Sequence, residues 1–75
     1  MDVYLIYSNN GSRTKVSTIT STLEKAKEYL SFLDSLKPAS CVRESEGLST
    51  KYFRSHEDGK LELLEHVFVE KRGVL

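Results

Sequence analysis

The chain has few of the residues that link a structure covalently or fix its backbone, because its 75 residues include one cysteine and one proline. A single cysteine, Cys41, cannot form an internal disulfide, which excludes a disulfide-stapled secreted scaffold and favours a reducing, cytoplasmic location. No stretch reaches the ~20 apolar residues of a membrane span, and no basic segment precedes an apolar one at the N-terminus. We therefore expect a cytoplasmic protein with no membrane partner.

Net charge is also absent, because eleven Lys and Arg balance eleven Asp and Glu and the two signs are interleaved along the chain. A neutral chain argues against a generic binder of the nucleic-acid backbone, which needs a basic face, although it leaves room for a local basic patch. The four glycines are far apart, so there is no phosphate-cradling loop and no Walker-type lysine. We predict no cofactor.

Two glycine turns are present. Asn10-Gly11 follows the apolar run at residues 3–7, and Asp58-Gly59 precedes the run at residues 60–64. Both dipeptides favour type I′ hairpin turns, in which both central residues have positive φ. The sequence therefore predicts one hairpin over residues 1–20, with residues 15–20 as an edge strand, and a second hairpin over residues 50–70.

A helix is predicted between the two hairpins, over residues 21–36. Ser21 and Glu24 match the capping box that begins many helices. Apolar residues then recur at spacings of three and four, which places them on one face of a helix. Pro38 cannot continue a helix and disfavours helical geometry in the residue before it, so the helix should end near Leu36.

The fold class predicted from these elements is α+β, in one domain covering residues 1–75. About four antiparallel strands form a sheet in the order β-β-α-β-β along the chain, and the helix packs on one face. Residues 41–43 offer a short additional strand, but we interpret residues 37–49 as a loop. Residues 71–75 are interpreted as a frayed tail.

The first and last strands are apolar on both faces, whereas one helix covers one face only. Three arrangements would cover the second face: another protein chain, the loop with the tail residues Val74 and Leu75, or a bulge near Glu65 that redirects side chains. We favour another chain, either a second copy in a homodimer or a different protein. The residues predicted to bind this partner are Tyr4, Ile6, Tyr52, Leu64 and Phe68.

Nucleic acid is the alternative partner, because residues 51–54 interleave basic and aromatic side chains on a predicted strand. Aromatic stacking combined with phosphate neutralisation is how sheet surfaces bind single strands. The residues predicted for this alternative site are Arg13, Lys15, Lys51, Tyr52 and Arg54.

Catalytic and metal-binding groups are sparse. His56, Glu57 and Asp58 are adjacent in a turn, where side chains usually diverge, and no second ligand cluster has zinc spacing. His66 lies inside a strand, and Cys41 has no histidine nearby in sequence that would mark a nucleophile. We predict no catalytic residue and no metal ligand.

Residues 3–7 (VYLIY) and 21–30 (STLEKAKEYL) resemble a group of short bacterial and bacteriophage proteins with a V-Y-L-x-Y strand, a hairpin and an S-x-x-E-K-A helix. The resemblance covers about residues 3–33 and implies a fold and a phage or mobile-element origin, with anti-CRISPR inhibitors as an analogy. We expect a non-enzymatic protein-binding module that modulates a host protein. A small structural or regulatory subunit is a further alternative.

Overall fold

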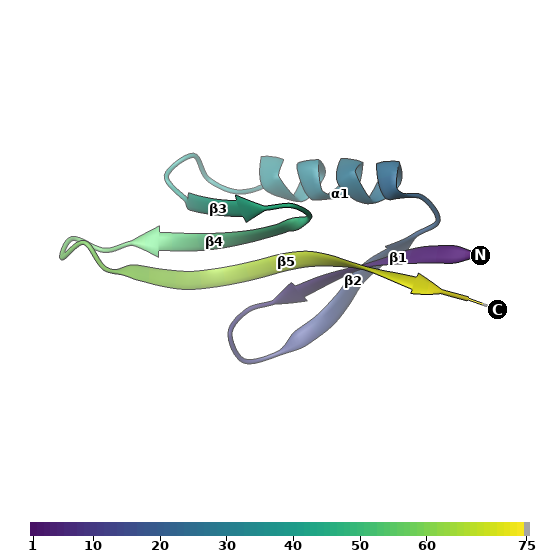
Figure 1. Ribbon diagram of the computed structural model, residues 1–75. Coiled ribbons are helices and arrows are strands. Elements are labelled where there is room, and N and C mark those ends of the chain that lie inside the picture. The colour runs from purple at the N-terminus through teal and green to yellow at the C-terminus, as the bar shows by residue number, and fades with distance from the viewer. Residues whose placement is uncertain (75) are drawn as a thin grey trace.

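A computed structural model describes residues 1–74. It contains five strands and one helix, arranged as two layers with the helix on the sheet (Figure 1). The elements in chain order are β1 (Asp2–Asn9), β2 (Thr14–Thr20), α1 (Leu23–Ser35), β3 (Val42–Glu46), β4 (Ser49–Ser55) and β5 (Leu61–Gly73). The strands form one sheet in the order β2-β1-β5-β4-β3, and every neighbouring pair is antiparallel. The predicted α+β class and the hairpin-helix-hairpin order are confirmed, and β2 lies at an edge as predicted.

The additional strand is β3, so the prediction of a loop over residues 37–49 is wrong for its second half. β3 pairs with β4 from Val42–Phe53 to Glu46–Ser49, and Gly47 makes the turn between them with a φ of 59°. All five residues of β3 are exposed. A strand with no buried face shows no apolar alternation, which is why its sequence reads as a loop.

The long strand β5 joins the two halves of the sheet. Its first part pairs with β4, and its second part pairs with β1 out to the pair Asp2–Gly73. Residues 71–73 are therefore paired and do not fray, because the first residues of β1 supply hydrogen-bonding partners at that end. Val74 N also donates to Met1 O at 2.7 Å, while Leu75 lies outside the described residues.

The two glycine turns are of a different type from the one predicted. Only the glycines have positive φ, 98° at Gly11 and 82° at Gly59, so neither turn is type I′. At the second turn Gly59 N donates to His56 O at 2.9 Å and His56 N donates to Lys60 O at 2.9 Å. This is the pattern of a type I turn followed by a glycine bulge, in which one residue alone needs the left-handed conformation.

The helix begins one residue later than the capping box predicts. Thr22, in an extended conformation, is the N-cap residue, and its side chain accepts a hydrogen bond from Lys25 N at 3.1 Å. Ser21 therefore does not cap the helix. The C-cap is Leu36, which is 63% exposed and is not part of the apolar stripe that packs on the sheet.

The core lies between α1 and one face of the sheet. Its buried residues are Ile6, Ala26, Tyr52 and Val67. Partly buried side chains surround them, namely Tyr4, Tyr29, Leu30, Leu33, Cys41 and Val69. Figure 1 shows α1 on this side of the sheet, and no second helix within residues 1–74 covers the other side.

Candidate interaction surface

The face of the sheet opposite α1, called the open face below, carries an apolar patch that crosses all five strands. Strand register defines it, because directly paired residues share a face. Leu5 pairs with Ile19, Tyr7 pairs with both Val16 and Phe68, and Phe53 pairs with both Leu63 and Val42. The exposed members of this open-face patch are Val16 (44%), Ile19 (58%), Val42 (37%) and Leu63 (40%).

An aromatic row occupies the middle of the open face. The rings of Tyr7 and Phe68 are stacked, with centroids 5.1 Å apart and planes inclined by 16°. His66 lies 5.0 Å from Phe68, and its Nε2 is 2.6 Å from Ser49 Oγ. Because the rings stack on each other, one face of each ring is covered by the other ring.

Charges of both signs border the row. Arg72 donates to Glu70 at 2.9 Å and to the Tyr7 hydroxyl at 3.4 Å, and the Glu70 carboxylate is the main cause of a raised pKa for Arg72. On the other side, Lys51 pairs in register with both Glu44 and His66. The open face therefore carries one apolar group around Tyr7 and Phe68 and a second around Phe53, with the paired row of Glu44, Lys51 and His66 between them.

Three of the five residues predicted to bind a partner lie on the other side of the sheet. Ile6 and Tyr52 are buried against α1 at 0% and 2% exposure, and Tyr4 packs against the same core. The sequence shows two apolar faces on β1, and the helix covers the face opposite to the one expected. Phe68 does lie on the open face.

Leu64, the fifth predicted residue, lies at an irregularity in β5. Tyr52 pairs with Glu65 but Phe53 pairs with Leu63, so Leu64 is the unpaired extra residue of a bulge and is 36% exposed. This bulge lies next to Glu65, at the position considered from the sequence. It brings Leu63 onto the same face as Phe53 and so extends the open-face patch toward the second hairpin.

Tyr52 is fixed by polar contacts under the helix. Its hydroxyl donates to Asp34 Oδ1 at 3.0 Å, and Arg43 Nε donates to the same oxygen at 2.6 Å. Burial, together with the Asp34 hydrogen bond, raises the pKa of Tyr52 to about 12. Hydrogen bonds from Arg43 and Tyr52 hold the pKa of Asp34 below its ordinary value. A ring held in this way cannot stack on a nucleic-acid base.

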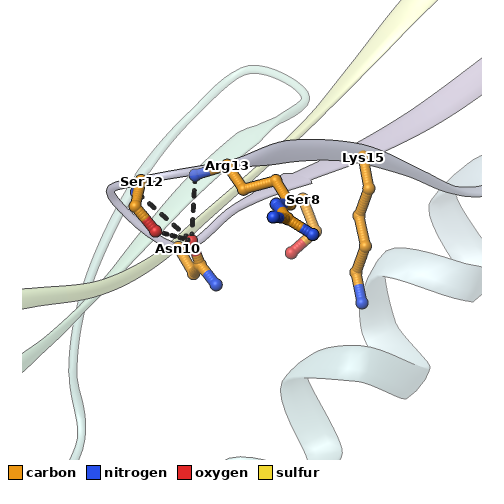
Figure 2. Close-up of a pocket in the computed structure, with 5 residues that line it drawn as sticks. All are labelled: Ser8, Asn10, Ser12, Arg13 and Lys15. Carbon is orange, nitrogen blue, oxygen red and sulfur yellow. Dashed lines mark hydrogen bonds between the residues drawn. The ribbon is translucent and has the colours of Figure 1, made fainter.

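The other residues predicted for nucleic acid do not form one surface. Lys51 lies on the open face, and Arg54 is 3.8 Å from Glu62 at the second hairpin. Arg13 and Lys15 line a polar hollow of about 390 Å³ at the far end of the first hairpin, together with Ser8, Asn10 and Ser12 (Figure 2).

His56 and Cys41, considered above as catalytic or metal-binding groups, both contact nearby residues. His56 Nε2 lies 3.2 Å from Glu62 Oε1, and Cys41 Sγ donates to Phe53 O at 3.5 Å. Within residues 1–74 no three His, Cys, Asp or Glu side chains are grouped to hold a metal ion. Over the same residues, no helix combines the length and apolar character needed to cross a bilayer.

No protein-family model, no curated protein and no solved structure matches this chain. The candidate surface therefore stands on its own geometry.

Proposed function

We propose that this chain is a non-enzymatic protein-binding module that docks through the open face of its sheet. One observation carries the proposal: the apolar side chains on this face, from Ile19 on β2 to Val42 on β3, have no covering element within residues 1–74. Exposed apolar side chains gathered on one face, with charged groups among them, commonly mark an interaction site on small proteins.

A protein fits this face better than a nucleic acid does. Tyr7 and Phe68 stack on each other, so each ring has one face already covered, whereas stacking platforms for nucleic acid offer open ring faces. Carboxylates also border the row, at Glu70 and Glu44, where a phosphate backbone would be repelled.

The partner that fits this surface is itself flat and apolar at its centre. A second copy of this chain meets that description, and the charges of both signs on this face allow two copies to face each other without general repulsion. A different protein with an exposed apolar face meets it equally. The resemblance of residues 3–33 to phage proteins leads us to propose that such a partner belongs to a bacterial host and is modulated by the docking.

The test compares two substitutions of nearly equal exposure on different sides of the molecule. Ile19→Lys changes the open face at a residue 58% exposed, and Phe32→Lys changes the helix at a residue 55% exposed. The mass of each protein is measured by light scattering over a concentration series. The proteins retained from a bacterial lysate by each immobilised variant are measured in parallel.

We expect self-association or a retained protein with the original chain and with Phe32→Lys, and loss of both with Ile19→Lys. Light scattering separates the second copy from a different partner. A monomer that retains nothing, or equal loss in the two variants, would contradict the proposal.

A further inference from the structure

The polar hollow at the end of the first hairpin has the composition of a binding site for an anion. It lies on the helix side of the sheet, since Ser8 pairs with Val67 and Lys15 pairs with Ser8. Figure 2 shows Asn10, Arg13 and Lys15 around one open space to the side of the helix. This site is separate from the open face and does not depend on the function proposed above.

Two cations at the hollow have no carboxylate partner. Within residues 1–74, neither Arg13 nor Lys15 has a carboxylate oxygen within 4.0 Å, whereas Lys37, Arg43 and Arg72 do. Glu65, which receives hydrogen bonds from Ser8 and Lys37, also feels the charge of Lys15. Because Lys37 neutralises Glu65, the local charge that remains comes from Arg13 and Lys15 and is about +2.

The Asn10 side chain adds a fixed donor. Its Oδ1 accepts from Ser12 N at 3.2 Å, from Ser12 Oγ at 3.2 Å and from Arg13 N at 3.1 Å. Three donors on one oxygen assign the amide orientation, so the Nδ2 group is the end left free. Figure 2 shows this nitrogen on the open side of the turn.

We infer that this hollow binds the phosphate group of a small phosphorylated molecule. A guanidinium, an ammonium and an amide N–H form a set of donors only, with two positive charges, which matches a phosphate dianion better than a singly charged carboxylate. The volume of about 390 Å³ is larger than a phosphate and falls in the range of small-ligand sites, so it leaves space for the rest of the molecule.

The test uses the ¹⁵N-labelled full chain and follows amide shifts while inorganic phosphate or phenyl phosphate is added at constant ionic strength. We expect saturable shifts at residues 8–15, and tighter binding of phenyl phosphate. Chloride at the same ionic strength serves as the reference for general screening. A short single-stranded oligonucleotide is titrated in the same way, to test whether the hollow binds the phosphates of a nucleic-acid backbone.

Three substitutions and one control define the site. Arg13→Ala and Lys15→Ala each remove a cation, and binding should weaken about tenfold or more. Asn10→Asp keeps the oxygen that holds the turn but replaces the free N–H group by a negative charge, so binding should be lost while the shifts of the turn amides remain. Lys25→Ala removes an exposed cation on the helix and should leave binding unchanged.

The inference is overturned if chloride reproduces the shifts or if Lys25→Ala weakens binding as much as Arg13→Ala. It is also overturned if the oligonucleotide binds more tightly than phenyl phosphate and its shifts extend to Lys51 and Arg54, because the site would then belong to a nucleic-acid surface.

Discussion

The two faces of the sheet carry similar side chains but have different surroundings. Ile6 and Ile19 lie one strand apart, yet Ile6 is 0% exposed under α1 and Ile19 is 58% exposed on the open face. Tyr52 is buried and its hydroxyl donates to Asp34, whereas Tyr7 is half-buried beside Phe68 on the open face. Residue type alone therefore does not decide which face becomes the core. The helix buries Ile6 on its side, while Leu5 on the open face is 8% exposed without it.

The polar groups show the same contrast. On the covered face Glu65 is half-buried and receives hydrogen bonds from Ser8 and Lys37. On the open face Glu70 meets only the exposed Arg72, in the part of the chain that the structure describes. Buried polar groups need partners to offset their lost hydration, and exposed ones do not. The covered face is thus built as a permanent interior, and the open face is built to meet water until a partner covers it.

The isoleucine pair gives the largest expected contrast. Ile6→Ala should reduce the free energy of unfolding by about 2–5 kcal/mol, because it leaves a cavity in the core. Ile19→Ala should change it by no more than about 0.5 kcal/mol in the monomer. Urea unfolding followed by circular dichroism measures both. Equal losses would mean that the open face is also covered within the chain.

The glutamate pair sharpens the contrast through pH. Burial raises the pKa of Glu65, but hydrogen bonds from Lys37 and Ser8 outweigh it and hold the pKa below the ordinary 4.5. The stabilisation is therefore complete above that ordinary value and is lost as the pH falls toward the lower pKa of the folded state.

Glu65→Gln should reduce the free energy of unfolding by about 1–2 kcal/mol at pH 7 and remove part of the acid sensitivity. Glu70→Gln, in an exposed pair, should change it by less than about 0.5 kcal/mol at every pH. The comparison is made by measuring the melting temperature of both variants between pH 3 and pH 7, in steps of roughly half a pH unit. A larger loss of stability in Glu70→Gln than in Glu65→Gln would contradict the view that the Glu65 side of the sheet is the interior.

The tyrosine pair gives the smallest effect at neutral pH. Tyr52→Phe removes the hydrogen bond to Asp34 and should lower the free energy of unfolding by about 1 kcal/mol. The loss stays small because Arg43 still donates a hydrogen bond to the Asp34 carboxylate. Because the folded-state pKa is about 12 against an ordinary 10.0, the original chain should lose stability as the pH rises through this range.

The Phe variant at position 52 should lack that alkaline component. Tyr7→Phe should cost only a few tenths of a kcal/mol. Titration of tyrosine absorbance in the original chain and in Tyr52→Phe, taken at about 12 pH values, measures the Tyr52 hydroxyl by difference. An ordinary pKa for Tyr52 would contradict its burial.

Much of the fold is predictable from local patterns. The alternation at residues 3–8 predicts β1, and the apolar spacing at residues 23–33 predicts α1, because both patterns reflect a face turned toward a core. β3 is not predictable in this way, since all five of its residues are exposed and it is held by pairing with β4. For the candidate surface, the sequence predicts that an apolar face exists but not which residues form it. The sequence shows that one apolar face is left over but not which one.

The sequence by itself determined two hairpins, one helix and a sheet with too many apolar side chains for one helix to cover. It could do so because turn glycines and the periodicity of apolar residues are local properties of the chain. Only the tertiary structure decided that α1 covers Ile6 and Tyr52, that Tyr7 and Phe68 remain outside, and that Arg13 and Lys15 share a hollow with Asn10. These outcomes depend on strand order, on a bulge and on where the helix lies, and each is set by contacts between residues far apart in the chain.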